Sequence, residues 1–113
     1  MSFQDITINI ANEFCETPGA REIEEGSFSG QDFLQRKLKP KFEEALQKKV
    51  KLIIDLDNTE GYATSFLEEA FGGLARLFSP EVVLTTLIFK CFDEPLLDDE
   101  IRMYITEANA IAG

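Results

Sequence analysis

The segment from Val50 to Phe78 constrains the fold of this chain more than any other part of its sequence. It opens with a nearly continuous apolar run, Val50 to Leu56, which predicts a central strand covered on both faces. Asp55 and Asp57 close this run, and a polar turn follows. Apolar residues then recur at helical spacing as far as Phe78. We therefore expect a strand, a tight turn and a helix N-terminus, and we place the functional site in the turn.

Patterns on either side of this segment predict alternating strands and helices. The isoleucines between Ile6 and Ile10 alternate with polar residues, and Val82 to Phe92 is β-branched and aromatic, so both stretches indicate strands. Helical spacing follows Ser29 and again follows Pro95. The order is roughly βαβαβα, which predicts an α/β fold. We expect a single domain over residues 1–113, because the pattern shows no linker and no repeat.

The first long helix has a clear start and one interruption. Ser29 is a candidate N-cap, and Asp32 falls at the third helical position, where an acid suits the helix dipole. Pro40 lies inside the helical run, so we expect a kink or two successive helices. We also expect a short strand around Glu22 to Ile23.

The helix after the turn carries its own signals. Ser65 and Glu68 have the spacing of a capping box, with Ser65 as the cap. Gly72 and Gly73 lie inside the helix, where glycine is unfavourable, and we interpret them as allowing the helix to approach the sheet closely.

Composition excludes several functions. The chain contains ten Phe and no His, and it carries a formal charge of −10. Without His, the usual general base, zinc ligand and Ser-His or Cys-His nucleophile arrangements are missing. The negative charge repels phosphate backbones and anionic membranes, so we expect neither nucleic acid nor a membrane as partner. We expect no cofactor and no bound metal, and a protein as the partner.

The cysteines and the N-terminal residues indicate the compartment. Cys15 and Cys91 show no metal or redox spacing, and we interpret both as free thiols in a reducing environment. The sequence begins without a basic and apolar leader, and no stretch is apolar enough to span a membrane, so we expect a cytoplasmic protein.

Three interpretations compete for the turn, Asp55 to Ser65. Asp55-Leu-Asp-Asn-Thr59 after a buried strand matches DxDxT, the first motif of haloacid dehalogenase phosphatases. In such an enzyme Asp55 is the nucleophile and Asp57 the acid/base, with Mg²⁺ holding the phosphate. Thr86, Lys90 and the pair Asp98–Asp99 can be assigned to the later motifs. However, the segment between the first and last motifs is too short for the crossover units that such an enzyme normally contains.

The other two interpretations concern hydroxyl groups. Thr64 and Ser65 stand at a helix start, where a phosphate is stabilised by the free N–H groups and the dipole. Phosphorylation at either residue is then a regulatory switch. In the structural interpretation, Ser65 only caps the helix and the aspartates shape the turn.

The same segment resembles a known family. The run KLIIDLDNTEGYATSFLEEAFGGL (residues 51–74), together with FSGQDF (residues 28–33), Leu38 and Pro40, resembles the STAS-like bacterial family of unknown function. That family is similar to the anti-sigma-factor antagonist (STAS) domains. The resemblance implies a mixed β-sheet with helices packed on it and a regulatory protein without enzymatic activity.

The resemblance to STAS domains also implies a kind of partner. Those domains bind a GHKL-type ATPase or serine kinase and are phosphorylated on Ser or Thr at the helix start, which corresponds to Thr64, with Ser65 beside it. Two positions differ, since Ala63 replaces their Asp and Phe66 their Gly. The expected contact surface consists of Asn58, Thr59, Glu60, Gly61, Tyr62, Thr64 and Ser65. Tyr62 is either a contact anchor or a ring packed on the sheet edge.

Overall fold

A parallel three-stranded sheet forms the centre of the computed structural model, which describes residues 4–14, 29–59 and 61–112, with side chains as far as Ala108. The strands β1 (Ile6–Asn9), β2 (Leu52–Asp55) and β3 (Leu87–Lys90) lie in the order β1-β2-β3. Both pairings are parallel, so the α/β class is confirmed, but the expected mixed sheet is wrong for the described strands. The reason is that a helical connection follows each of the first two strands and returns the chain in the same direction.

The chain between β1 and β2 is mainly helical. A short α1 (Ile10–Glu13) follows β1, and α2 (Gly30–Phe33), η2 (Leu34–Leu38) and α3 (Lys39–Lys48) form one continuous helical run. The Ser29 hydroxyl accepts a hydrogen bond from the Asp32 N–H at 3.0 Å, which confirms the predicted cap. Pro40 lies in the first turn of α3, and the preceding wide π-turn accommodates its missing N–H without ending the helix.

A second continuous helical run follows β2 and comprises α4 (Thr64–Leu67), η3 (Glu68–Gly72) and α5 (Gly73–Phe78). Gly72 and Gly73 face other helices rather than the sheet, so the expectation that they allow close approach to the sheet is wrong. A Cβ on Gly73 would lie 2.7 Å from the Leu34 side chain, and one on Gly72 would lie 3.6 Å from the Tyr104 carbonyl. Helix-to-helix packing therefore requires a glycine at position 73, whereas at Gly72 the distance to α7 is an ordinary van der Waals contact.

The predicted strand from Val82 to Phe92 is wrong over its first half. Residues Pro80–Thr86 form the helix α6, and only Leu87–Lys90 are extended. The Ser79 hydroxyl caps this helix by accepting from the Val82 N–H at 3.3 Å, and Pro80 occupies its first turn. These start signals outweigh the β-branched composition. The last helix, α7 (Leu96–Ala112), lies where it was predicted.

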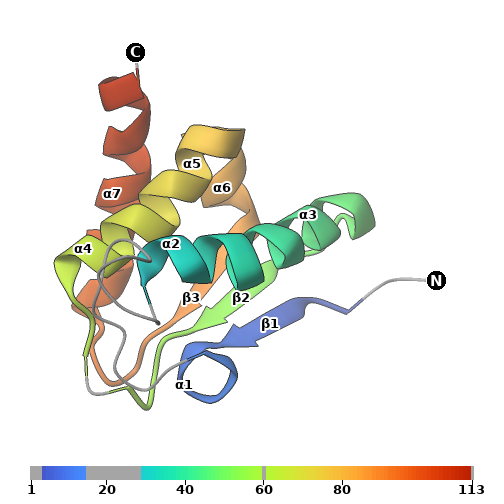
Figure 1. Cartoon of the computed structure of the whole chain (residues 1–113). Helices are drawn as coiled ribbons and strands as arrows, with labels where there is room; N and C mark the ends of the chain where they lie inside the picture. Colours follow the sequence, from blue (N-terminus) through green and yellow to red (C-terminus); the bar gives the residue numbers. More distant parts are fainter. Residues whose placement is uncertain (1–3, 15–28, 60, 113) are drawn as a thin grey trace.

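The long helices cover one face of the sheet. Ile8, Leu52 and Ile54 point into this face and are buried, whereas Thr7 and Ile88 on the alternate positions are exposed. In Figure 1, α2 and α3 lie in front of the strands. Right-handed crossovers in a sheet of order β1-β2-β3 place the connecting helices on the same side. Phenylalanines fill much of the core between the helices: Phe33, Phe42, Phe66 and Phe71 are fully buried.

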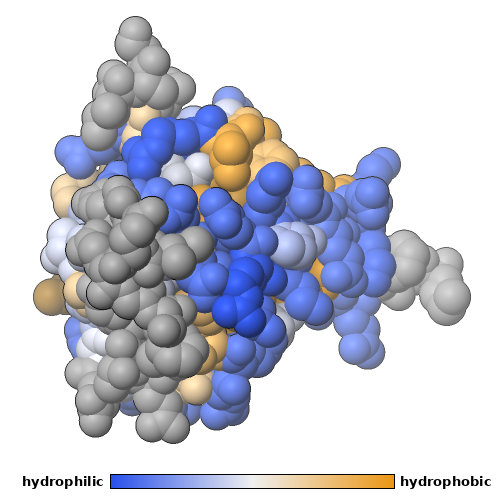
Figure 2. Space-filling view, viewed as in Figure 1, coloured by the Kyte–Doolittle hydropathy of each residue, from blue (hydrophilic) through white to orange (hydrophobic). Residues whose placement is uncertain are grey.

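The surface is mostly polar on the helical side. Figure 2 shows hydrophilic side chains over α2 and α3 and an apolar group over α5 and α6, where Leu77 and Val82 are exposed. None of the helices in the described part of the chain has the length and apolar character needed to cross a membrane. The strand considered at Glu22 to Ile23, and Cys15, lie outside the described residues.

Candidate functional site

The carboxyl ends of the three strands meet in a row of polar side chains. Asn9, Asp55 and Lys90 are cross-strand partners, each the last residue of its strand. The Asp55 carboxylate accepts from the Asn9 amide at 3.2 Å and from the Lys90 ammonium at 3.3 Å. Its other oxygen accepts from the Asp57 backbone N–H at 3.1 Å. Asp55 is only 7% exposed, so this carboxylate is buried and fully engaged in holding the strands together.

A second pair of contacts joins the two loops that leave the sheet. The Asp57 carboxylate accepts from the Asp93 N–H at 2.9 Å, and the Asp93 carboxylate accepts from the Asn58 N–H at 2.9 Å. Asn58 has a backbone φ of 70°, a left-handed conformation that asparagine tolerates better than most residues. The loop after β2 is thus locked to the loop after β3 by reciprocal side chain–backbone bonds.

This geometry differs from the expected phosphatase site. Of the positions assigned to later motifs, Lys90 contacts Asp55, but Thr86 lies at the opposite end of β3 and Asp98 pairs with Arg102 at 2.5 Å. Neither Asp55 nor Asp57 lines any of three surface hollows in the described part of the chain. Among residues 4–14, 29–59 and 61–112, no three Cys, Asp or Glu side chains gather where they could hold a metal ion.

For a STAS-like chain we expect the two aspartates to diverge, one toward backbone N–H groups and the other toward solvent. Asp57 does turn toward a backbone N–H. Asp55 does not face solvent, because Asn9 and Lys90 enclose it.

The side chain of Tyr62 holds the turn against the rest of the fold. The Tyr62 hydroxyl donates to the Leu56 carbonyl at 2.8 Å, and its ring lies 6.1 Å from the ring of Phe66. Burial, the largest cause, and the nearby Asp55 and Asp57 charges raise the pKa of Tyr62 well above its usual value. Tyr62 therefore packs against the fold, but its ring lies on Phe66 of α4 and its hydroxyl at the end of the central strand, not on the edge of the sheet.

Two further turn residues show why the chain bends here. The Thr59 hydroxyl accepts from the Gly61 N–H at 3.3 Å. Gly61 has a φ of 132°, which side chains disfavour, so a glycine is needed at this position. Glu60, the remaining member of the expected surface in this turn, lies outside the described residues.

The hydroxyl pair lies at the helix start, but the predicted capping box is wrong. Ala63 is the N-cap and provides no side-chain hydrogen bond, while Thr64 is already the first helical residue. Ser65 therefore lies within the first turn, two residues after the capping position, and its hydroxyl cannot serve as the N-cap. Thr64 is exposed and Ser65 is half-buried.

Thr64 also contacts the last helix. Burial raises the pKa of Tyr104, as does the hydrogen bond to Glu100, whereas a hydrogen bond with the Thr64 hydroxyl opposes this shift. The Tyr104 hydroxyl donates to the Glu100 carboxylate at 2.7 Å. The side chain of Thr64 thus lies beside an acidic hydrogen-bonding group on α7.

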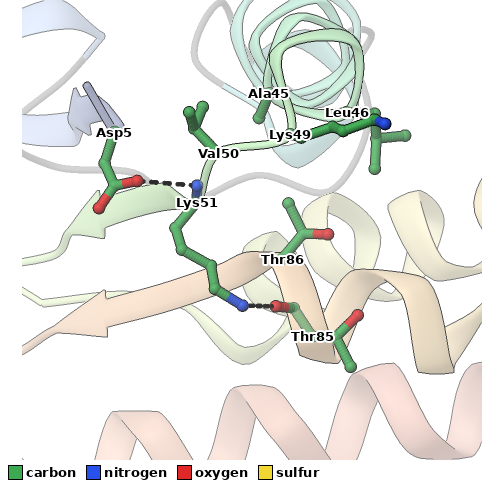
Figure 3. A pocket seen from close by; sticks show the side chains of 8 residues that line it. All are labelled: Asp5, Ala45, Leu46, Lys49, Val50, Lys51, Thr85 and Thr86. Atoms are coloured by element: carbon green, nitrogen blue, oxygen red, sulfur yellow. Dashed lines mark hydrogen bonds between the residues drawn. The ribbon is translucent and has the colours of Figure 1, made fainter. Parts of the chain in front are cut away.

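A hollow at the opposite end of the sheet serves the fold. Lys51 donates its backbone N–H to Asp5 at 2.9 Å and its ammonium to the carbonyl of Thr85, so it ties β2 to its neighbours (Figure 3). Lys49, the other cationic side chain lining the hollow, lies beside Leu46 and points away from Lys51. The two cations therefore do not converge on a common ligand position.

The sequence did not predict the observed role of three residues in the strand-end network, Asn9, Lys90 and Asp93. Asn9 and Asp93 were not considered, and Lys90 was considered only as part of an enzyme motif. A usable signal was present for Asn9 and Lys90, because the residues that end neighbouring parallel strands lie at one edge of the sheet.

Comparison with known proteins defines the family. No curated protein and no solved structure gives a significant match to the chain. The family model described as STAS-like domain of unknown function (DUF4325) matches residues 29–96, which is more than half of the chain. The match includes both the strand-end aspartates and the helix start. The chain therefore belongs to the family of STAS-like domains of unknown function.

Proposed function

We propose that this protein is a non-enzymatic regulatory module that binds a protein partner through the turn and helix start, residues 58–65. Membership of the STAS-like family supports a regulatory or interaction role. The observation that carries the proposal is the exposed Thr64 at the start of a long helical run whose N-cap lacks a side-chain bond. A modifying enzyme or a partner can reach this hydroxyl directly.

Phosphorylation of Thr64 is the proposed switch. The free N–H groups of the first helical turn and the helix dipole favour a phosphate at this position. The phosphate would add up to about two negative charges next to the hydrogen-bonded pair Tyr104 and Glu100. Repulsion from Glu100 then breaks the contact between Thr64 and α7, which changes the surface that a partner meets.

The partner class follows from the similarity to STAS domains, and is a GHKL-type ATPase or serine kinase in the cytoplasm. The test is recovery of such a partner from cells that make the protein, using wild type, Thr64→Glu and Thr64→Val as baits. Thr64→Glu imitates the added charge, whereas Thr64→Val keeps the shape and is the matched control. We expect Thr64→Glu alone to change the amount of an ATPase that is recovered. Equal recovery by all three baits, or recovery of no ATPase, contradicts the switch.

The phosphatase alternative retains one supporting observation, the contact between Lys90 and Asp55. It predicts that the purified protein with Mg²⁺ hydrolyses a generic aryl phosphate and that Asp55→Asn abolishes this activity. We expect no hydrolysis above that of Asp55→Asn, because both aspartates are occupied by hydrogen bonds within the fold.

A further inference from the structure

In the described part of the chain, the long helices lie on one face of the sheet, and side chains on the opposite face are accessible. Thr7, Ile53 and Ile88 lie in register across the three strands on this face. Ile88 is 43% exposed, and Ile53 on the central strand is partly exposed. Parallel sheets usually have helices on both faces, because each face is largely apolar. Within residues 4–14, 29–59 and 61–112, this face therefore lacks the second helical layer that is usual for a parallel sheet.

An apolar hollow adjoins this face at the end of β3. It has a volume of about 460 Å³, and Ile88, Phe89, Cys91, Phe92 and Pro95 contribute to its lining. The rings and aliphatic side chains around it are unusually accessible, since Phe92 and Leu96 are each 78% exposed. The hollow is large enough to receive one or two apolar side chains from another molecule.

The surroundings of the hollow are acidic. Asp93, Glu94, Asp98 and Asp99 follow one another closely along the loop and the first turn of α7. Within the described chain, no cationic group lies within ion-pair distance of Glu94 or Asp99. Lys90 lines the hollow, but its ammonium is already paired with Asp55. Arg102, beside the Phe89 ring, is paired with Asp98, so the free carboxylates of Glu94 and Asp99 favour a cationic ligand at this rim.

We propose that the accessible sheet face and the hollow at the end of β3 bind a basic amphipathic helix of a partner protein. A helix is the element that covers parallel sheets, its apolar side chains would enter the hollow beside Ile88 and Phe92, and its Lys and Arg side chains would pair with Glu94 and Asp99. A second copy of this chain docking by the same face would bring like charges together. This surface is different from the turn and helix start at residues 58–65.

The test uses a fluorescently labelled, 18-residue amphipathic peptide of Leu and Lys, with a Leu and Glu peptide of the same pattern as control. Binding is measured by fluorescence anisotropy at physiological salt. We expect the Leu–Lys peptide to bind and the Leu–Glu peptide not to bind. Ile88→Thr and Phe92→Ser leave the net charge unchanged, and each should weaken binding roughly tenfold, as expected for a contact residue at the centre of an interface.

Matched variants separate specific docking from general attraction to an acidic protein. Leu77→Ser alters the exposed apolar group over α5 and α6 and should leave the affinity unchanged within about twofold. Equal weakening by Leu77→Ser and Phe92→Ser, or equal binding of both peptides, overturns the proposal. Sedimentation tests whether a second copy of this chain occupies the surface. A concentration-dependent dimer that Phe92→Ser abolishes would assign the surface to a second copy and would also overturn the proposal.

The outcome is independent of the function proposed above. Thr64→Glu alters the helix start and should not change peptide binding. Circular dichroism and the urea midpoint of each variant check that it remains folded, which we expect because Phe92 is so largely exposed. A loss of peptide binding by folded Phe92→Ser, with no effect of Leu77→Ser, supports the docking surface whether or not Thr64 is a switch.

Discussion

The strand ends and the helix start contain the same kinds of polar residue, but the fold uses them differently. At the strand ends, Asp55 is buried and its carboxylate accepts three hydrogen bonds. At the helix start, Thr64 is exposed and the N-cap provides no side-chain bond. The comparison indicates that the aspartates hold the sheet and its loops together, whereas Thr64 is exposed at the surface.

The largest effect is expected at the strand ends. Asp55→Ala removes the acceptor for Asn9, Lys90 and the Asp57 N–H, and should lower the free energy of unfolding by about 3 kcal/mol. Urea denaturation measures this change. The exposed Asp99→Ala is the control and should change stability by less than about 0.5 kcal/mol. Similar values for the two variants would remove the structural role assigned to Asp55.

The position of the helix start at Thr64 depends on a close contact between α4 and α2. A Cβ on Gly30 would lie 2.5 Å from the backbone carbonyl oxygen of Phe66, which cannot move without displacing α4. Gly30→Ala should therefore cost about 2 kcal/mol. Gly72→Ala is the comparison, because its closest contact, at 3.0 Å, is the flexible carboxylate of Glu68. We expect thermal unfolding to show the larger loss for Gly30→Ala, and the reverse order would refute this packing.

Two serines near helix starts give a direct contrast. Ser29 is fully buried and caps its helix, so Ser29→Ala should cost about 1 kcal/mol. Ser65 does not cap, so Ser65→Ala should change the free energy of unfolding by only about 0.3 kcal/mol or less. Chemical denaturation of the two variants in one buffer measures both changes in the free energy of unfolding. A loss at Ser65 as large as at Ser29 would restore the capping box that the sequence predicted.

The smallest effect concerns Tyr62, which joins the two regions. Tyr62→Phe removes the donor to the Leu56 carbonyl and should cost about 0.5–1 kcal/mol near neutral pH. The pKa of Tyr62 is raised in the folded protein, so its contribution is complete below the usual tyrosine pKa near 10 and is lost as pH rises above 10.

Denaturation between pH 8 and 11 checks the sign of this effect. Wild type should lose stability above pH 10 more steeply than Tyr62→Phe, since the variant has no phenol to ionise at that position. Parallel curves for the two proteins would show that the Tyr62 hydroxyl is not held in the protonated form by the fold.

Much of the fold could be predicted because its signals are local. The apolar run before Asp55 predicted β2, and Ser29 with Asp32 predicted the start of α2. The stretch after Pro80 was assigned to the wrong element because two local signals conflict there, and the cap at Ser79 outweighs the β-branched residues. A single sequence gives no measure of that balance.

The site was harder to predict than the fold because its key contacts join distant parts of the chain. The aspartates were correctly placed at the strand end, but the partners of Asp55 are Asn9 and Lys90, on two other strands. Only the register of the sheet brings them together. Motif spacing also did not predict the shift of the N-cap by two residues, from Ser65 to Ala63.

The most direct test of the regulatory proposal is photo-cross-linking in cells that normally make the protein. A photoreactive amino acid replaces Asn58 or Thr64 in one set of experiments, and the exposed Gln47 on α3 as the control. We predict that positions 58 and 64 yield the same discrete adduct with one protein partner and that position 47 does not. No adduct at 58 and 64, or the same adduct at all three positions, would contradict the claim that the turn and helix start form the contact surface.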